Sequence, residues 1–573
     1  MSARSRIIQF ALAVLFGLSR AACARPVQSG TPRDQEAEIR SLYARQQWEA
    51  ILRKIPRSAK GPADLKYYRG MALAHLGRWA EARATLEAGW KQSSRDERFP
   101  VALAEVAYRQ NDFAGARRCL RRALKLKPGD RYAVEFLASL YFLQDNLDAA
   151  LEEWNRIGEP RIRWIETDPP ARTDPELLDR AFAIAPASTL KLGDLRTTRA
   201  RLDNLGVFPR YRFDLVPAAD AQAANRYDLR FSPIERNGWG QGKLEALLAT
   251  LGGLPYETLN PRYANFRRRA INFSSLVRWD DAKRRLLLRV SAPLHDDPAW
   301  RYTLFADGRD EHWNLSDTFH AAGPPLSDLQ FRRIELGATV RRVVNGRLAW
   351  STGIVVARRT FGHFSASAFA SNPAFTDCES IEGRAGTRAV LLDDPARRFR
   401  LESGVSARFG RNFGSGRFAR GLAMLKANWS PKAEGDDWET SEEIRAGAVS
   451  QNVPLDELFM LGLDRDNDLP LRAHIGTKDG MKGNAPLGDR FLLSNWEIDK
   501  NVYSNGWVQL RLAPFLDSGH ITDGSGPFGE KEWLWDTGAE LKVRVLGGVQ
   551  AVLTYGKDLR TGRNTFYATI VRH

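Results

Sequence analysis

Cysteine and histidine are scarce in this chain of 573 residues, and their scarcity excludes several classes of protein. The 3 Cys are Cys23, Cys119 and Cys378, which are too few to form the disulfide framework of a small secreted domain. The 8 His form no H-E-x-x-H pattern, and no paired-Cys spacing accompanies them. A G-x-S-x-G nucleophile elbow is also missing. We therefore expect no metal, no cofactor and no enzymatic activity, although residues on different strands can form a Ser-His-acid set that sequence does not reveal.

Long apolar runs are missing as well. Beyond the N-terminus no run is long enough for a membrane-spanning helix. The N-terminus has basic residues at Arg4 and Arg6, an apolar run of about 12 residues, and an A-x-A pattern that ends at Ala24. This pattern predicts a signal peptide over residues 1–24, and Arg20 argues against a lipoprotein signal. An exported chain without a spanning helix can still cross a membrane as a closed β-barrel.

Acidic residues are fewer than basic ones, with 69 Asp and Glu against 85 Lys and Arg, a net charge of +16. A basic balance suits nucleic acid, anionic lipid or simple solubility. Because no nucleic-acid motif is present, we expect no nucleic-acid partner. The hydrophobic fraction of 43% is ordinary for a globular protein, and the length predicts about three domains.

The first of these domains is predicted over residues 33–160, where a pattern repeats every 34 residues. The small residue of each repeat is Ala82, Ala116 or Ala150, and the same spacing relates two further sets of large residues: Trp79, Phe113 and Leu147, and Leu86, Leu120 and Trp154. Small residues where two helices cross, with large ones beside them, predict stacked helical hairpins. The pattern resembles the tetratricopeptide repeat. Such a domain is either a spacer or a groove that binds a partner peptide.

Residues 161–236 predict a small α/β domain with the order β-α-α-β-β. "RIRWIET", "RYRFDLV" and "YDLRFSPIE" alternate as strands, and two helical patterns lie between the first strand and the second. The Leu-Gly-x-Phe element at Leu205 to Phe208 resembles the helix-to-strand turn of a polypeptide-transport-associated (POTRA) domain. The edge of such a sheet can pair with an extended client. The alternative is an α/β spacer without a binding role.

Residues 237–573 are almost entirely strand, with alternation in pieces of about 8 to 14 residues. Leu286 and Leu288 share one face, whereas Arg285 and Arg289 share the other. Length and pattern predict a transmembrane antiparallel β-barrel of about 16 strands, with apolar side chains toward lipid and charged ones in the lumen. A large soluble β domain is the alternative. Five tryptophans are candidates for the interfacial girdle: Trp300, Trp313, Trp429, Trp507 and Trp533.

The stretch "DRDNDLPLRAHIG", residues 464–476, begins like a calcium loop. An EF-type loop needs Gly at its sixth position and a bidentate Glu at its twelfth, but Leu469 and Ile475 occupy these places. We therefore expect no metal there. Asp517, which faces the predicted lumen from the strand "WVQLRLAPFLDSG", needs a cationic partner, because an unpaired buried charge is costly. Arg472 can fold inward to supply it, and Glu497 can share the arginine.

Two motifs in this region resemble the superfamily of outer-membrane protein assembly factors and two-partner-secretion translocators. The family combines POTRA domains with a 16-stranded barrel. Its barrel has a long loop whose Val-Arg-Gly-Phe/Tyr tip folds into the lumen, where the arginine engages the Asp of a Phe-x-Asp-x-Gly strand motif. Here the strand motif runs intact from Phe515 to Gly519. The loop tip reads Leu471-Arg472-Ala473-His474, with Ala in place of Gly and His in place of the aromatic residue. The chain also ends on His573 rather than on Phe or Trp.

The resemblance implies an outer-membrane barrel protein that inserts or translocates client polypeptides, with its N-terminal domains in the periplasm. Its partners would be unfolded client proteins, outer-membrane lipids and a periplasmic protein at the repeats. The alternative is a passive outer-membrane channel or scaffold whose repeats bind a periplasmic partner. Client identity and the route, lateral insertion or passage through a pore, do not follow from the sequence.

Overall fold

The computed structural model describes residues 32–56, 61–218, 226–240, 253–320, 326–363, 372–414, 416–431, 437–450, 453–505, 507–524, 526–545 and 549–572. The predicted signal peptide and the terminal His573 lie outside these ranges. The chain divides into two compact units, Met1–Arg161 with Ala219–Arg226, and Ile162–Ala218 with Tyr227–His573. Helices of the described ranges are all too short or too polar to span a membrane. Cys119 and Cys378 are free thiols.

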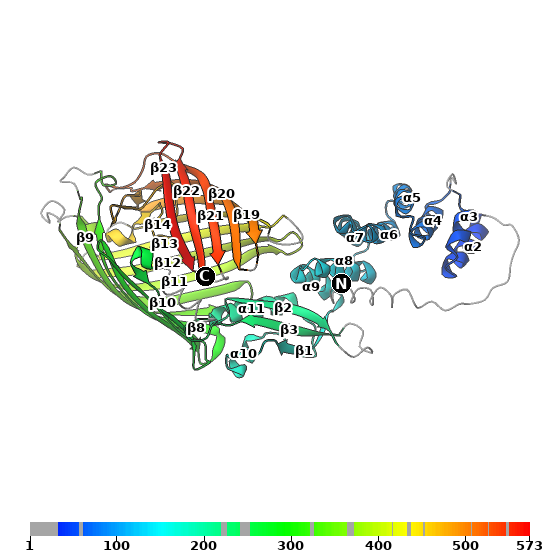
Figure 1. Ribbon diagram of the computed structural model, residues 1–573, viewed down its shortest axis with the longest axis horizontal. Coiled ribbons are helices and arrows are strands. Elements are labelled where there is room, and N and C mark those ends of the chain that lie inside the picture. Colours follow the sequence, from blue (N-terminus) through cyan, green and yellow to red (C-terminus); the bar gives the residue numbers. More distant parts are fainter. Residues whose placement is uncertain are drawn as a thin grey trace. The chain divides into compact units, whose positions relative to one another are not determined.

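The first unit consists of antiparallel helical hairpins (Figure 1). Their helices are α2 (Pro32–Ala44), α3 (Trp48–Lys54), α4 (Ala63–His75), α5 (Trp79–Gln92), α6 (Arg98–Arg109), α7 (Phe113–Leu126), α8 (Arg131–Leu143) and α9 (Leu147–Trp154), followed by the short η1 (Asn155–Ile157). The hairpins from α4 to α9 follow the repeat of 34 residues. Helices α2 and α3 form a further hairpin ahead of them.

The repeat positions explain why these hairpins stack. Ala82, Ala116 and Ala150 are fully buried where the helices cross. A larger side chain at these positions would separate the two helices. Between the helices of each hairpin the chain turns through a left-handed residue, which is Gly77 in the first repeat, with φ of 75°. Asn111 takes the same place in the second, with φ of 60°. Asn tolerates this conformation better than most residues.

The second unit begins with the small α/β domain. Its elements are β1 (Arg161–Thr167), α10 (Pro175–Ala181), α11 (Leu192–Leu205), β2 (Arg210–Pro217) and β3 (Arg226–Ile234). The sheet order is β1-β3-β2, so β1 and β2 are its two edges. Gly206 ends α11 in a left-handed conformation, with φ of 66°, as expected for a helix C-terminus. Phe208, Phe213 and Phe231 form the core beneath the helices.

Helix α11 lies against turns at one end of the barrel. The Asn204 side chain donates to the Pro298 carbonyl at 2.9 Å, and Arg301 donates to the Leu205 carbonyl at 2.6 Å. On a neighbouring barrel turn, the Gly346 amide donates to the Thr197 hydroxyl at 3.1 Å. Since strands alternate in direction, these contacts mark the end opposite to the long connection that follows β14.

The barrel wall is a sheet of consecutive antiparallel strands whose order returns on itself, with β23 beside β4. Its strands are β4 (Thr258–Leu259), β5 (Arg262–Phe266), β6 (Ile271–Asp280), β7 (Lys283–Leu294), β8 (Asp297–Trp313), β9 (Leu329–Val343), β10 (Leu348–Gly362), β11 (Cys378–Asp394), β12 (Phe399–Phe413), β13 (Gly416–Trp429), β14 (Trp438–Val449), β19 (Arg490–Ser504), β20 (Val508–Thr522), β21 (Leu534–Val545), β22 (Val549–Asp558) and β23 (Asn564–Arg572). Both β4 and β5 pair with β6, so they form one interrupted strand. The described wall therefore has fifteen strands.

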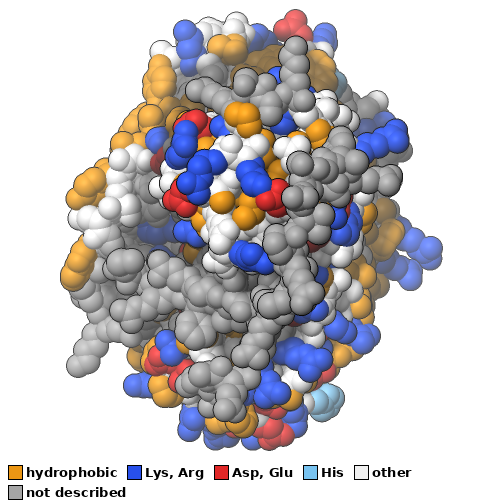
Figure 2. Space-filling model, turned by 90° about the vertical axis from the view of Figure 1, so that its right-hand side faces the viewer, with side chains coloured by type: hydrophobic (Ala, Val, Ile, Leu, Met, Phe, Trp, Pro, Cys, Tyr) orange, Lys and Arg blue, Asp and Glu red, His pale blue; other side chains and the backbone are white. Residues whose placement is uncertain are grey.

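Alternation along these strands separates two environments. Outward apolar side chains are roughly half or more exposed, among them Leu286, Ile334, Ile354, Val405 and Phe409. Inward positions carry charged side chains that are nearly or fully buried, among them Asp307, Glu335, Arg359, Glu382 and Asp517. An apolar outer face around a polar lumen is the arrangement of a transmembrane barrel. Basic groups are prominent on the face shown in Figure 2, in keeping with the net charge of +16.

One of the predicted girdle tryptophans does not lie on the outer face. Trp429, Trp507 and Trp533 are exposed, as a lipid-facing girdle requires. Trp313 is instead 6% exposed and packs inside with Leu329. It follows the lumen-facing residues of β8 at alternate positions, so the prediction for Trp313 was wrong by the alternation rule itself.

Candidate functional site

The candidate site is the long connection between β14 and β19, residues 450–489, which we name the lumen loop. It contains η4 (Leu455–Glu457) and two small ladders, one of β15 (Phe459–Met460) with β18 (Leu487–Gly488) and one of β16 (Thr477–Lys478) with β17 (Met481–Lys482). The side-chain partners of the loop are inward-facing residues on both sides of the barrel. The loop therefore folds into the lumen.

The tip of the loop is a tight turn over residues 471–474. The His474 amide donates to the Leu471 carbonyl at 3.0 Å, which closes the turn. Ala473 does not have a positive φ, so this turn needs no glycine at the place where the resembling family has one. Leu471 is fully buried and Ala473 is 3% exposed. The tip is thus packed within the protein.

Arg472 projects from this turn onto Asp517 of β20. Its Nε lies 2.9 Å from Asp517 Oδ2, and its Nη2 lies 2.7 Å from Asp517 Oδ1. The Arg472 backbone amide also donates to Asp517, at 3.1 Å. Asp517 is fully buried and Arg472 is 6% exposed. A two-pronged, charge-assisted contact of this kind is among the strongest that a buried carboxylate can make.

Three further groups complete the surroundings of Arg472. Its Nη1 pairs with Glu497 of β19 and lies 3.5 Å from Glu540 of β21. The guanidinium carbon lies 3.8 Å from the ring centre of Phe515, so the ring makes a cation–π contact with Arg472. The structure thus brings Arg472, Asp517, Glu497 and Phe515 together in one cluster.

Small residues on the wall make room for this cluster. A Cβ at Gly519 would lie 3.0 Å from Leu461 and 3.6 Å from Leu471, so the glycine of the strand motif accommodates the loop. A Cβ at Gly556 of β22 would lie 2.4 Å from the Arg472 carbonyl. Gly556 was not predicted from the sequence. Its role depends on a contact between a loop and a strand far apart in the chain.

His474, at the family's aromatic position, faces two carboxylates of the wall. Its Nδ1 lies 3.1 Å from Asp536 Oδ2, and its Nε2 lies 3.9 Å from Asp558 Oδ2. The Ala473 amide donates to Asp536 at 2.6 Å. Asp536 is fully buried and Asp558 is 4% exposed. The histidine therefore joins the tip to β21 and β22 by polar contacts, where a phenylalanine would offer only its ring.

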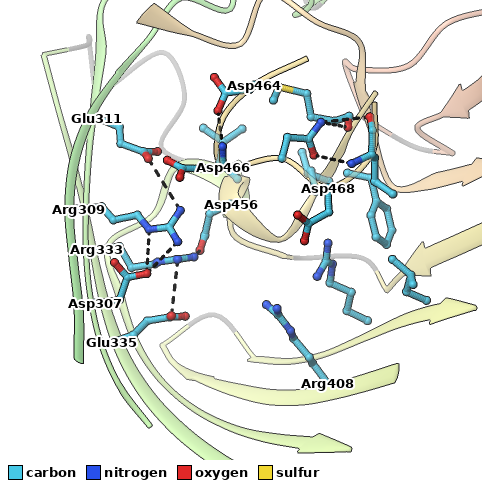
Figure 3. Close-up of a pocket in the computed structure, with 18 of the residues that line it drawn as sticks. Asp307, Arg309, Glu311, Arg333, Glu335, Arg408, Asp456, Asp464, Asp466 and Asp468 are labelled. Atoms are coloured by element: carbon cyan, nitrogen blue, oxygen red, sulfur yellow. Dashed lines mark hydrogen bonds and ion pairs between the residues drawn. The ribbon is translucent and has the colours of Figure 1, made fainter. Parts of the chain in front are cut away.

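The stem of the loop, which we define as residues 455–460, has a second set of partners that the sequence analysis missed. Asp456 lies 2.6 Å from Arg333 of β9 and 2.8 Å from Arg359 of β10. Glu457 lies 3.1 Å from Arg359 and 3.3 Å from Arg408 of β12. Arg359 and Glu457 are fully buried. Figure 3 shows Asp456 directed at Arg333, which projects from the barrel wall.

The acidic run that resembles a calcium loop supplies a third attachment. Asp466 lies 2.8 Å from Arg278 of β6 and 2.7 Å from Arg285 of β7. Asp464 bonds to Thr477 of the same loop and lies 3.7 Å from Lys283 of β7. These carboxylates therefore serve as anionic anchors for a basic wall. Asp468, by contrast, is exposed at the edge of the same run.

The two sides of the lumen carry opposite charge. The strands from β6 to β13 present the basic wall, which we define as Arg278, Arg285, Arg309, Arg333, Arg359, Arg384, Arg408 and Arg420. Fewer carboxylates share those strands, chiefly Asp307, Glu311, Glu335 and Glu382. The strands from β19 to β22 present the acidic wall, which we define as Glu497, Asp499, Asp517, Asp536, Glu540 and Asp558. The repeated inward arginines are the signal in the sequence that could have indicated an acidic partner from elsewhere in the chain.

Between the loop and the basic wall lies a cavity of about 1060 Å³. Its lining carries both charges, with Arg309, Arg333 and Arg408 on the wall side and Asp456, Asp466 and Asp468 on the loop side (Figure 3). The cavity is therefore polar, as expected for the interior of a wide barrel.

Comparisons with known proteins agree with parts of this description. Residues 64–88 and 101–160 match family models of the tetratricopeptide repeat. No curated protein matches the sequence. Among solved structures, the chain is similar to BamA from Haemophilus ducreyi lacking POTRA domains 1–3, with 11% identity, 72% of this chain and 84% of that chain covered, and a TM-score of 0.43.

Two further solved structures are similar. CdiB from Escherichia coli has 14% identity, 72% of this chain and 76% of that chain covered, and a TM-score of 0.46. CdiB from Acinetobacter baumannii has 13% identity, 72% and 73% coverage, and a TM-score of 0.43. At this level of similarity the function must be argued from the residues of this chain. By its own architecture, the chain is a β-barrel protein that carries N-terminal tetratricopeptide repeats.

Proposed function

We propose that this chain is an outer-membrane barrel protein that inserts or translocates client polypeptides, and that the lumen loop holds the barrel in its closed resting state. The observation that carries the proposal is the attachment of one loop to both walls of a charged lumen. Asp466 binds the basic wall, and Arg472 binds the acidic wall. A loop held in this way blocks free passage, yet polar contacts can exchange with water or with a client when it is released.

The plugged lumen argues against a passive channel. A porin-like channel needs a lumen that stays filled with water. Here Arg472 and Asp517 are buried within the barrel, and the loop tip packs against the wall. A loop that only stabilised the wall would not need attachments on opposite sides, because either side alone would fix it to the barrel. The structure therefore favours a barrel that opens on demand.

The domains before the barrel would receive the client. We assign residues 1–24 to a signal peptide, 33–160 to the repeats, 161–236 to a POTRA-like domain and 237–573 to the barrel. In this proposal the repeats and the POTRA-like domain lie in the periplasm. Strand β2 is an edge of the small sheet, and an extended segment of a client can pair with it. The repeats would hold a client or a periplasmic partner in their groove.

The neighbourhood of the first and last barrel strands suits lateral release. Strand β23 lies beside β4, which is only two residues long, Thr258–Leu259. The Tyr256 hydroxyl donates to the Ala568 carbonyl of β23 at 3.1 Å. An edge opened at this seam can template a client strand. We propose no catalytic step, no catalytic metal and no cofactor for this function.

The proposal is tested by depletion of the protein followed by an inventory of outer-membrane and surface proteins. We expect a defined set of β-rich or secreted proteins to fall in abundance, and we expect the wild-type gene to restore them. A gene that carries Asp517→Arg should fail to restore them, whereas the matched control Asp468→Asn should succeed. An unchanged inventory after depletion would contradict the proposal. Lipid hydrolysis by the refolded protein would contradict the absence of catalysis.

A further inference from the structure

A cluster of metal-ligating side chains lies on the rim of the barrel, apart from the lumen loop. His312 is near the end of β8, Asp328 comes immediately before β9, and His363 comes immediately after β10. The strand register brings them together, because Gln330 pairs with His312 on one side and with Gly362 on the other. The ends of three consecutive strands therefore bring one side chain each to the same place.

The cluster lies on the outer face of the barrel end. On β8 the alternate residues Asp307, Arg309 and Glu311 line the lumen, so His312 points outward. The side chains of His312, Asp328 and His363 are 25%, 53% and 58% exposed, so an ion in solution can reach them. This rim is opposite to the turns that contact α11, as the direction of β8 requires.

The geometry places one carboxylate between two imidazoles. His312 Nδ1 lies 2.6 Å from Asp328 Oδ1, and His363 Nδ1 lies 3.6 Å from Asp328 Oδ2. One ligand atom of each of the three residues lies within 4.8 Å of the other two. In a tetrahedral zinc site, bonds of about 2.0–2.1 Å place neighbouring ligand atoms about 3.3 Å apart. Shifts of less than about 1 Å in exposed side chains would satisfy this geometry.

Asp328 is available to bind an ion together with these two histidines. Most inward carboxylates of this protein pair with arginine or lysine, but within the described ranges Asp328 has ion-pair contacts with the two imidazoles alone. The neighbouring Asp310 already accepts from Arg332 at 3.1 Å and from Gln330 at 2.9 Å.

We propose that His312, Asp328 and His363 form a binding site for a divalent transition-metal ion, with Zn²⁺ as the best fit. Two imidazoles and a carboxylate are ligands that zinc prefers, whereas calcium and magnesium require more oxygen ligands. The fourth position is open to water. The bound ion would tie together the ends of β8, β9 and β10.

The position of the site gives it a consequence for the lumen loop, which rests on the function proposed above. On the inner side of the same strand ends, Trp313, Leu329 and Phe331 pack against Leu455 and Met460 of the loop. A metal tie on the outside would stiffen the strands that hold the stem of the loop inside. The bound ion would therefore favour the closed state of the barrel.

The site is tested on the full chain, folded in detergent, stripped with a chelator and titrated with Zn²⁺ by calorimetry. We expect saturable binding of one ion, and affinity that falls at least about 10-fold in His312→Gln, Asp328→Asn and His363→Asn. Asn at 363 suits the left-handed φ of 61° at this residue. The matched control is His320→Asn, an exposed histidine of the same rim region outside the cluster, which should bind as the wild type does. Equal affinity in all variants, or no saturable binding by the wild type, would overturn the site.

A second measurement does not depend on the folding of any variant. Electron paramagnetic resonance of Cu²⁺ bound to the wild-type chain reports nitrogen ligands directly, and we expect the signature of two imidazoles. Coordination by oxygen alone would overturn the proposal. The conductance of the barrel across a bilayer tests the link to the closed state. If Zn²⁺ binds and the conductance does not change, that link is rejected, but the metal site remains.

Discussion

The two walls of the barrel lumen carry opposite charge, and the same loop binds both. The basic wall offers arginines from many strands, and the loop meets them with Asp456 of its stem and Asp466 of its acidic run. The acidic wall offers carboxylates, and the loop tip meets them with Arg472. Neither wall is balanced by its own residues, because each has an excess of one sign. The loop is therefore the counterion of both walls at once.

The opposite charges of the two walls explain why the loop has one position. Acidic and basic anchors follow one another along the chain, so a reversed loop would place Arg472 against arginines and Asp466 against carboxylates. Like charges at close range cost several kcal/mol in an interface, about as much as the correct contacts contribute. The charge order thus specifies the orientation of the loop, and hydrophobic packing around Leu471 and Leu461 fixes its depth.

The largest effect should come from a change on the acidic wall. Asp517→Arg removes the carboxylate that Arg472 contacts and puts two guanidinium groups in a buried space. We expect the free energy of unfolding to fall by at least about 3–5 kcal/mol, the usual loss when a buried pair is broken. The measurement is the urea midpoint at which the barrel loses its heat-resistant migration on gels.

Addition of Arg472→Asp to that variant should restore part of the loss. The restoration is partial because Glu497 and Glu540 also face position 472 and would repel the new carboxylate. If Asp517→Arg leaves the urea midpoint unchanged, the ion pair contributes nothing to the folded barrel.

A somewhat smaller effect is expected at the basic wall from Asp466→Asn. Within the described part of the chain, Arg278 has no other carboxylate within 4.0 Å, so its buried guanidinium loses its partner. Arg285 keeps Asp307 at 2.7 Å. We expect a loss of about 3 kcal/mol in the same unfolding experiment. Asp468→Asn is the matched control, since that side chain is exposed, and should change the free energy by less than about 0.5 kcal/mol.

A milder loss should follow Asp456→Asn on the same wall. Arg359 keeps Glu382 at 3.0 Å and Glu457 at 3.1 Å, so its charge remains compensated. We expect a loss of about 1–2 kcal/mol, below that of Asp466→Asn. The comparison of the two urea midpoints checks this order. A reversed order would mean that the stem of the loop, rather than its acidic run, is the main anchor on the basic wall.

The smallest effect is expected from His474→Phe, which gives the tip the aromatic residue of the resembling family. The change removes the contacts to Asp536 and Asp558 and leaves the Ala473 amide as a donor to Asp536. We expect a loss of about 1 kcal/mol, the value of one polar contact at a buried acceptor. A gain in stability would show that the ring, and not the polar contact, is what this position requires.

The sequence predicted the parts of this structure that depend on local pattern. The 34-residue period predicted helical hairpins, because each repeat needs the same small residue where its helices cross. Alternation predicted an apolar outer face and a charged lumen. Arg472 and Asp517 were singled out together because the Phe-x-Asp-x-Gly motif is intact and an inward carboxylate requires a cation.

Other features depend on contacts between distant residues, and the sequence alone does not reveal them. Asp466 and Arg278 are 188 residues apart. No periodicity relates a loop carboxylate to the strand that it will meet, so this anchor was read only as a failed calcium loop. Trp313 was assigned to the lipid face from its aromatic character, although it lies on the lumen side of β8 and packs against the loop. The wall contacts of Gly556 arise in the same way.

Single-channel recording in planar bilayers shows whether the lumen loop closes the barrel. We expect the wild-type barrel to show little steady conductance, because the lumen loop is attached to both walls. The double variant Arg472→Ala with Asp466→Asn should show a larger and fluctuating conductance, since both attachments are weakened. A large, constantly open pore in the wild type, or equal conductance in the two proteins, would contradict the claim that this loop closes the barrel.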